Sequence, residues 1–563
     1  MKRILSLILT VALLLTGFGC KSSVPEKTYH TDLSFSGLSD SGTDAALEIA
    51  RAKELQFRIA RGELAGTRAQ EALETRANAL NRLRTDEAIA YVRYCLDVTN
   101  VENRRKYDTL TVQLQTLACI LTDISLMLAK DPELKDVYDG ETLEALLRAD
   151  ALSDPAVLPL LERERTLEGD YEALPGKLTV NLNGREWTGD EILSDPTLSI
   201  DDFTYLYESY SKLFNAEAGA IFLELIAVRN EIAGTLGFDS YADYMYACYD
   251  RDYTPQDAAQ LSERVKVAIV PLFSEMRSDF FSAGAQLYGM VFEEEPTMER
   301  IGSAVAEILP ELSEPWEYML AHSMYDLGTN ETRMPGSFTT YFEDYGAPFL
   351  FSSWTNGFEM PSTVIHEFGH YASFYLNAGA VYGANSLDLA EIDAQGLELL
   401  SVLRYDTLYN DLSGAAETAQ IFYALYTLID GCMEDAFQQF AYGQETPTIE
   451  ALNAEYGRLA EAYGLDLLGS DARSWTQIAH TFQSPFYYIS YAAGMTAALE
   501  LYLSARRDPN AAGKAYRAVL MRERGARFSE TLHAAGLSDP FATETIKKLA
   551  IELGSDRRLR KNE

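Results

Sequence analysis

The first part of the chain, from about Asp44 to Asp131, has the hydrophobic pattern of long helices. Alanine, leucine, glutamate and arginine dominate it, and no strand-like alternation of apolar and polar residues is present. Apolar residues recur on one face over the range 110–128, which predicts a single long helix with a broad apolar stripe. Nothing in this region indicates chemistry, so we expect the first 150 residues to be a scaffold.

Three short segments have the pattern of β-strands and turns instead. Apolar residues alternate over 178–182, ahead of Asn183-Gly184, a dipeptide typical of a hairpin turn. Further on, the ranges 335–341 and 347–354 are rich in aromatic residues and bounded by glycine and proline. We expect two extended segments there, either an edge strand that binds an extended peptide through its main chain or a plain structural hairpin.

The rest of the sequence is predominantly helical, and the predicted fold class is mainly α. Asp201-Asp202 is the expected cap of a new helical run, so we place a soft domain boundary near residue 200. A chain of 563 residues is too long for one ordinary core. We therefore expect an N-terminal helical domain over 44–200 and a second domain over 201–556.

The composition is that of a globular, strongly acidic protein. Hydrophobic residues make up 47% and charged residues 23%, and the formal net charge is −38. This charge argues against a nucleic-acid partner, because cationic side chains must replace the counterions of the phosphates. Cys95, Cys119, Cys248 and Cys432 form no C-x-x-C pair, so no redox motif or cysteine zinc site is indicated. Buried thiols are the usual state of such cysteines, and a disulfide in an exported chain stays open.

The N-terminus has the features of an export signal. Lys2 and Arg3 precede an apolar run over 4–18, which is too short to span a bilayer. The following Gly19-Cys20 is similar to the bacterial lipoprotein signal, in which the cysteine becomes the lipidated first residue. We expect a signal peptide over 1–19, a lipidated polar tether over 20–43 and an extracytoplasmic protein anchored to the cell membrane. An ordinary cleaved signal and secretion are the alternative.

The opposite end of the chain, residues 557–563, is a basic tail. Basic residues in such a tail can contact anionic lipid headgroups, but we expect a solvated terminus here.

The run His366-Glu367-Phe-Gly-His370 carries the main chemical signal. Its flanks are apolar at helical spacing, and residues four apart on a helix share one face, so both imidazoles can bind one ion. Glu367 can reach a metal-bound water without being a ligand, as the general base of a metalloprotease requires. Two surface histidines beside a solvated glutamate would give the same motif, but the chain has only six histidines. We predict one zinc ion per chain.

A catalytic zinc ion needs a third protein ligand. Asp388, Glu391, Gln395 and Glu398 form one polar stripe on a predicted helix otherwise rich in leucine, isoleucine and alanine. Such a stripe is usually a solvent-facing surface. It is equally suited to placing one carboxylate on the ion and others on the histidines, and periodicity does not choose among the carboxylates.

A later cluster places His480 among tyrosines, ahead of Tyr491. A histidine in this setting could donate a hydrogen bond to the oxyanion of a tetrahedral intermediate, while aromatic core packing is the alternative. The sequence contains no Gly-x-Ser-x-Gly and no Walker A pattern, so serine hydrolase and P-loop functions have no support.

Together these motifs resemble the thimet oligopeptidase and oligoendopeptidase F group of zinc metallopeptidases. The resemblance covers roughly residues 177 to 500. Its specific part is the zinc motif, a glutamate 25 residues after the first histidine, and the late His/Tyr cluster. It implies a bilobed helical fold with a deep channel for short unfolded peptides and a small β-sheet beside the motif helix.

The resemblance also implies the roles of individual residues. Glu391 is the third zinc ligand, and Glu367 is the base and proton shuttle. His480 binds the substrate or the oxyanion, and Tyr491 donates a hydrogen bond to the tetrahedral intermediate. Glu398 is predicted to contact the zinc-binding histidines without being a zinc ligand itself.

Three further substrate contacts are predicted, namely Ser352, Tyr487 and Tyr488. A further tyrosine of the family is replaced by Ser484 in this sequence, and the spacing after His480 holds one extra residue. The predicted function is a membrane-tethered zinc endopeptidase acting on short peptides. A peptide-binding lipoprotein that does not cut, which Ser484 favours, and a carboxypeptidase with the same zinc chemistry are the alternatives.

Overall fold

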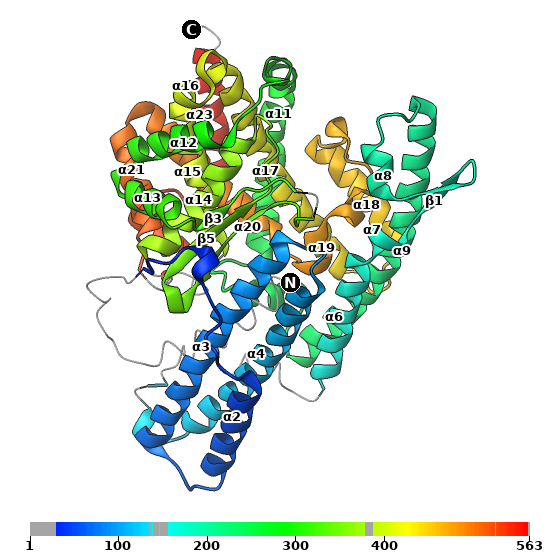
Figure 1. Cartoon of the computed structure of the whole chain (residues 1–563). Coiled ribbons are helices and arrows are strands. Elements are labelled where there is room, and N and C mark those ends of the chain that lie inside the picture. The colour runs from blue at the N-terminus through cyan, green and yellow to red at the C-terminus, as the bar shows by residue number, and fades with distance from the viewer. Residues whose placement is uncertain are drawn as a thin grey trace. The chain divides into compact units, whose positions relative to one another are not determined.

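The computed structural model describes residues 30–135, 137–138, 146, 156–330, 332–377, 387–523 and 525–560. Within them helices predominate, and the strands form two small sheets (Figure 1). The mainly α fold class expected from the sequence is confirmed. Cys20 and the predicted export signal lie outside the described residues.

The chain divides into two compact units, each built from stretches that are separate in the sequence. Of the described residues, the first unit contains those within 156–274 and 426–492, and the second contains those within 30–146, 275–425 and 493–560. The boundary expected near residue 200 falls inside the first unit. The structure divides the chain differently because helices distant in sequence pack into the same core, which a linear pattern does not reveal.

Three long helices begin the second unit: α2 (Ala45–Ala60), α3 (Gly66–Leu96) and α4 (Val101–Leu128). They pack against one another through a shared apolar cluster. By length and composition, α4 is the one helix in the described part of the chain that could cross a membrane. Leu117, Leu121 and Ile124 of α4 are fully buried in that cluster, as in the core helix of a globular protein. The predicted helical run is confirmed, and so is its apolar stripe over 110–128 except at Val112, which is exposed.

Residues 30–43, the described part of the predicted polar tether, lie on the second unit. The Thr31 N–H donates to the Tyr345 carbonyl oxygen at 2.9 Å. Phe35 packs against Phe349, with ring centroids 4.5 Å apart. The His30 ring stacks on Tyr375 at 3.8 Å. Aromatic side chains within this polar stretch give it apolar partners, which holds it against the body.

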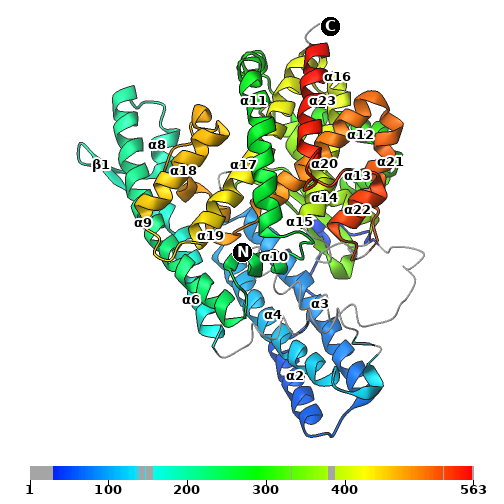
Figure 2. The same ribbon diagram turned by 180° about the vertical axis from the view of Figure 1, so that it is seen from behind.

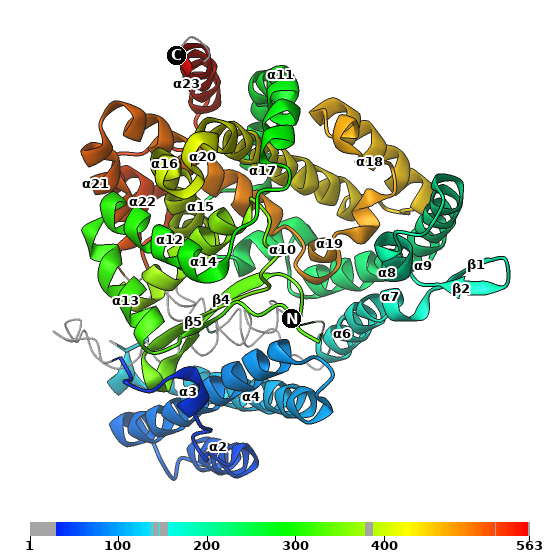
Figure 3. The same cartoon turned by 45° about the horizontal axis from the view of Figure 1, so that its top comes forward.

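A three-stranded sheet lies beside the helices that carry the predicted zinc motif. Its strands are β3 (Tyr325–Asp326), β5 (Ala347–Ser352) and β4 (Ser337–Phe342), in that order, with β4 antiparallel and β3 parallel to β5. The expected extended segments are confirmed, and β4 is an edge strand of this sheet. Figure 3 shows β4 and β5 next to α14 (Met360–Leu376), which packs on both strands and on α15 (Leu387–Ser401).

The first unit contains the predicted hairpin and the helices around it. Strands β1 (Val180–Leu182) and β2 (Arg185–Trp187) pair antiparallel across Asn183-Gly184, and both turn residues have positive φ angles, 54° and 84°. The helical run predicted near 200 is α9 (Ile200–Thr235), but its cap is Ser199 and not the expected Asp201-Asp202. The Ser199 hydroxyl accepts the Asp202 N–H, and the two carboxylates lie in the first turn.

Further helices complete the two units (Figure 2). In the first unit they are α6 (Leu158–Glu172), α7 (Leu174–Lys177), α8 (Gly189–Ser194), α10 (Tyr241–Cys248), α18 (Ile449–Tyr463) and α19 (Ala479–Gln483). In the second unit they are α12 (Glu294–Ile308), α13 (Ser313–Ala321), α16 (Tyr405–Tyr409), α21 (Pro509–Leu520), α22 (Phe528–Ala535) and α23 (Thr545–Arg560). Three helices contribute residues to both units: α11 (Pro255–Leu287), α17 (Ser413–Tyr442) and α20 (Tyr488–Arg507).

Two further predictions concern the cysteines and the basic tail. Cys95, Cys119, Cys248 and Cys432 form no disulfide bond with one another. Arg557, the first residue of the predicted basic tail, lies on α23 and donates to Asp279 at 2.8 Å. The start of that tail is therefore held by a carboxylate of α11.

Candidate metal and active site

Helix α14 places the two motif histidines on one face. Proline stands at its first turn, where a missing N–H costs nothing, and Val364, Ile365 and Phe368 are fully buried against the core. His366 and His370 lie on the opposite, partly exposed side, one helical turn apart, with ring centroids 5.2 Å from each other.

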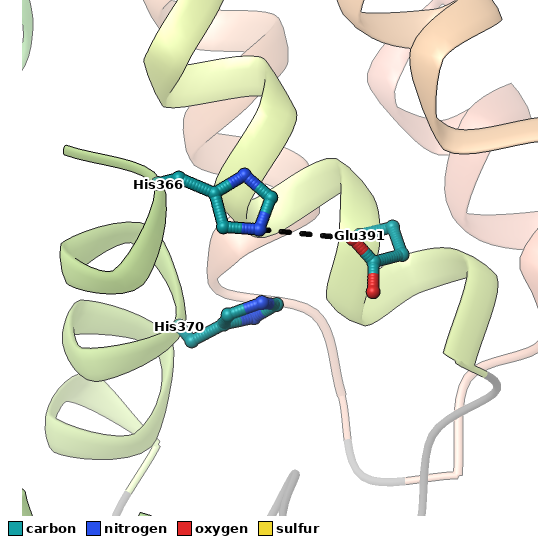
Figure 4. A group of neighbouring side chains, drawn as sticks. All are labelled: His366, His370 and Glu391. Carbon is teal, nitrogen blue, oxygen red and sulfur yellow. Dashed lines mark ion pairs between the residues drawn. The ribbon is translucent and has the colours of Figure 1, made fainter. Parts of the chain in front are cut away.

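Helix α15 brings the third group. One potential ligand atom from each of His366, His370 and Glu391 lies within 4.8 Å of the others, and this is the single such cluster among the described residues. Figure 4 shows both imidazole rings and the Glu391 carboxylate pointing toward one another, with 3.9 Å between His366 Nε2 and Glu391 Oε2. The polar stripe of α15 is therefore not a solvent-facing surface, and Glu391 is the carboxylate that converges with the histidines.

Two glycines allow this convergence. A Cβ on Gly369, between the histidines of α14, would clash with the carbonyl oxygen of Asp393 and would lie 2.6 Å from the Cα of Ala394 on α15. A Cβ on Gly494 of α20 would lie 2.9 Å from the Glu391 Cβ. Real Cβ atoms do not approach so closely. Helices α14 and α20 therefore pack this closely on α15 only because Gly369 and Gly494 lack side chains.

The Nδ1 atom of His366 faces a second carboxylate. This atom lies 3.1 Å from Glu398 Oε2. Glu398 follows Glu391 by about two turns of α15. A carboxylate at this position accepts the Nδ1–H, so Nε2 is the nitrogen whose lone pair becomes available for an ion when it loses its proton. Glu398 thus lies against His366, and its predicted supporting role stays a prediction.

The electrostatics of the centre favour a cation. Burial by itself lowers the pKa of His366, but the hydrogen bond to Glu398 and the nearby Glu391 and Glu367 carboxylates outweigh it and raise the pKa to about 9. The same carboxylates that stabilise the protonated imidazole would stabilise a bound cation. Two imidazoles and one carboxylate are also a ligand set that zinc uses in catalytic sites, so these residues fit the predicted ion.

Glu367 is held by the neighbouring sheet. Its side chain is 7% exposed, and its Oε2 accepts a hydrogen bond from the Thr339 hydroxyl of β4 at 2.9 Å. The same hydroxyl lies 2.9 Å from the Glu367 carbonyl oxygen. Thr339 thus links the edge strand to the motif helix and restricts the rotamer of the proposed base, a contact that no local sequence signal indicated.

A buried ion pair fixes α15 from its other side. Arg522 donates to both carboxylate oxygens of Asp393, at 2.6 and 2.9 Å, and both side chains are 2% exposed. The Tyr516 hydroxyl donates to the Asp393 main-chain oxygen at 2.7 Å. Sequence reasoning missed this pair because its members are 129 residues apart.

The late His/Tyr cluster lies in the first unit. The His480 ring centroid is 5.3 Å from those of Tyr487 and Tyr488 and 6.3 Å from that of Tyr491. His480, Tyr488 and Tyr491 are partly exposed, whereas Tyr487 is buried. The structure therefore brings the four predicted residues together, and their roles toward a substrate stay predictions.

Two arginines, one buried and one partly buried, hold the segment that carries this cluster. Arg229 is fully buried, donates to Glu164 and Glu168 at 2.7 and 2.9 Å, and also donates to the Phe482 carbonyl oxygen on α19. Arg251 donates to the Phe486 carbonyl oxygen at 2.7 Å.

Phe486 has a φ angle of 61°, a left-handed conformation that a bulky residue adopts only when its surroundings enforce it. Its N–H donates to Gln438 at 2.6 Å.

Two other positions singled out in the sequence are buried. Ser484 is 4% exposed, and its N–H donates to the His480 carbonyl oxygen at 2.8 Å. Ser352, predicted to contact substrate, ends β5 with its hydroxyl 2.7 Å from that of Ser337. Its predicted contact with a substrate is not tested by this arrangement.

Comparison with known proteins agrees with this fold. Residues 279–551 match the model of peptidase family M3. A solved structure described as an oligoendopeptidase F is 22% identical, with a TM-score of 0.78, and the alignment covers 94% of this chain and 99% of that one. PZ peptidase A, solved with an inhibitor, is 20% identical with a TM-score of 0.77, covering 94% and 99%.

A protein of Bacillus anthracis str. Ames, described as an oligoendopeptidase F, is 19% identical with a TM-score of 0.75, covering 94% of this chain and 98% of that one. At these identities the solved structures establish the fold alone. No curated protein sequence matches the chain significantly.

The helical fold and the His-Glu-x-x-His site together define a peptidase. The part of the chain over residues 279–551 is similar to peptidase family M3, and the resemblance stated from the sequence is confirmed to that extent.

Proposed function

We propose that the protein is a zinc-dependent endopeptidase that hydrolyses short, unstructured peptides. The observation that carries this proposal is the convergence of His366, His370 and Glu391, whose ligand atoms lie within 4.8 Å of one another beside Glu367. These three residues would hold one zinc ion. When bound, that ion would supply a Lewis acid for the scissile carbonyl and lower the pKa of a water molecule.

The residues around the ion have distinct tasks in this proposal. Glu367 accepts the proton of the attacking water and returns it to the leaving amine. Thr339 holds the Glu367 carboxylate through its 2.9 Å hydrogen bond, so the base is already oriented before a substrate arrives. Following the family resemblance, His480 and Tyr491 donate hydrogen bonds to the oxyanion of the tetrahedral intermediate.

The edge strand β4 suggests how a peptide is held. Among the described strands it pairs with β5 alone, so main-chain groups on its other side are not part of the sheet ladder. Thr339, in the middle of this strand, contacts the base directly. An extended peptide added to β4 would therefore run past Glu367, which is the geometry that β-augmentation by an endopeptidase substrate requires.

Replacing Glu367 by glutamine tests the base. E367Q should retain zinc, measured by elemental analysis, and should lose about 10²- to 10⁴-fold in kcat/KM on an internally quenched peptide. The matched control is E299Q, at an exposed glutamate of α12, which should cleave like the wild type. Wild-type rates for E367Q would refute the assignment of the base.

The same assay separates the alternatives. Peptides blocked at both ends should be cut internally, and a chelator should abolish cutting until zinc is restored. Cleavage confined to peptides with a free C-terminus would instead identify a carboxypeptidase. Retention of intact peptides by zinc-loaded protein, seen by mass spectrometry, would identify a binding protein that does not cut.

A further inference from the structure

Behind the candidate metal centre lies a buried amide that no part of the proposed reaction uses. Gln420 of α17 is 6% exposed, and its Nε2 donates to Glu398 Oε1 at 2.6 Å. The other oxygen of that carboxylate, Oε2, faces His366 Nδ1 at 3.1 Å. Glu398 is therefore held at both of its oxygens, by an amide on one side and by the imidazole on the other.

Two hydroxyl groups set the orientation of the amide. The oxygen of Gln420 accepts hydrogen bonds from Ser362 at 2.9 Å and from Tyr405 at 3.0 Å. The two hydroxyls are 2.9 Å from each other, and both side chains are buried. With its oxygen committed to these donors, the Gln420 amide has only its NH₂ group to present to Glu398.

These hydrogen bonds form a network that ends at His366, a predicted metal ligand. Ser362 and His366 lie one turn apart on α14, Glu398 lies on α15, Tyr405 on α16 and Gln420 on α17. Residues from four helices thus form one network, and every contact in it has hydrogen-bond distance. The sequence indicated no role for Tyr405 or Gln420.

We propose that Gln420 is a positioning residue for the zinc site: by holding Glu398, it fixes which nitrogen of His366 carries the proton and which is left for the ion. The inference rests on the proposed zinc site. Loss of the amide would leave Glu398 free to rotate away from Nδ1, and His366 would then have to be ordered by the ion itself.

The test measures zinc affinity directly, by competition with a chromogenic chelator, on protein freed of metal. Partners behind a ligating histidine typically contribute about 10- to 100-fold in metal affinity, and we expect about 10-fold weaker zinc binding for Q420M. Y405F removes one of the two hydroxyl donors to the amide and should weaken binding less than Q420M.

A matched control separates positioning from a general loss of packing. Gln70 of α3 is also 6% exposed, donates to a glutamate (Glu74, 3.2 Å) and accepts from a tyrosine (Tyr138, 2.8 Å). Q70M and Q420M should lower the Tm of the metal-free protein comparably. Only Q420M should weaken zinc binding.

A double-mutant cycle tests whether Gln420 acts through Glu398. E398Q alone should weaken zinc binding, and adding Q420M to it should cause no further loss. Additive losses, or wild-type affinity in Q420M, would overturn the proposal. Failure of the wild-type protein itself to bind zinc would instead overturn the proposed function, so the two failures are distinguishable.

Discussion

Glu87 shows at the residue scale how surroundings set the chemistry of a side chain. It lies on α3 with 7% of its surface exposed, and its Oε1 accepts a hydrogen bond from the Thr111 hydroxyl at 3.0 Å. Burial raises the pKa of this carboxyl to about 7, against the smaller lowering effects of Thr111 and Arg84. The folded protein therefore binds this proton more tightly than the unfolded chain does.

The sign of the resulting pH dependence follows from linkage. The contribution of Glu87 to stability is fully present below pH 4.5, its ordinary pKa, and is lost as the pH rises through about 7. This single group should cost about 3 kcal/mol of stability over that range. The E87Q variant cannot ionise and should escape the loss, so its Tm should exceed that of the wild type at pH 8 by more than at pH 5.

Calorimetry at the two pH values measures this difference. E71Q, at an exposed carboxylate on the same helix, serves as the control and should follow the wild type. A wild type and an E87Q variant whose Tm values change in parallel between pH 5 and pH 8 would contradict the buried-acid assignment.

At the element scale, the metal centre depends on how closely α14 and α15 approach. His366 and His370 come from one helix and Glu391 from the other, so the convergence of ligands is a property of the helix pair. Gly369 is the contact point, since an added Cβ would meet the backbone of Asp393 and Ala394. The buried pair of Arg522 and Asp393 holds α15 in that position from behind.

Substituting alanine for Gly369 should separate the two helices. Overpacking costs about 1–3 kcal/mol, and the helix-propensity gain from glycine to alanine, about 1 kcal/mol, offsets only part of it. We expect G369A to have a lower Tm and weaker zinc binding, because Glu391 moves away from the histidines with α15.

Gly284 of α11 provides the control for this substitution. No atom lies within 4 Å of a Cβ built there, so G284A should be neutral or slightly stabilising. Unchanged zinc affinity in G369A, measured beside G284A by chelator competition, would show that the close approach is dispensable.

At the scale of the whole molecule, the question is how the chain is held in the cell. Residues 30–43 pack on the second unit through contacts such as Thr31 to Tyr345 and Phe35 to Phe349. We propose that Cys20 carries the lipid anchor, as the Gly19-Cys20 sequence predicts.

Cell fractionation in a bacterial host tests the anchor. The wild-type protein should sediment with membranes and incorporate labelled fatty acid, because acyl chains provide the membrane affinity. C20S should lose the label and leave the membrane fraction, whereas C119S should behave like the wild type. Equal labelling of C20S and the wild type would rule out this cysteine as the anchor.

Much of the fold was predictable because its signals are local. The helices over 45–128, the Asn183-Gly184 hairpin and the strands β4 and β5 all follow from periodicity and turn chemistry. The division into units was not predictable, since it depends on packing between stretches hundreds of residues apart. For the same reason nothing in the sequence indicated that residues 30–43 of the predicted tether pack on the second unit.

The candidate site divides in the same way. His366, Glu367 and His370 are adjacent in sequence, and helical geometry alone places the histidines on one face. Glu391 required the family resemblance, because Asp388, Glu391 and Glu398 share one stripe and periodicity treats them alike. Thr339, Gln420 and Arg522 had no sequence signal at all, since each reaches the site from another element.

The sequence by itself therefore determined the elements and the ligand types, because hydrogen bonding along a helix or hairpin involves residues close in the chain. Only the tertiary structure decided which carboxylate meets the two imidazoles, which hydroxyl holds the base and which amide stands behind Glu398. Those choices depend on side chains from different helices approaching within a few ångströms. Such approaches are set by the shape and packing of side chains, and a linear pattern of residues does not specify either.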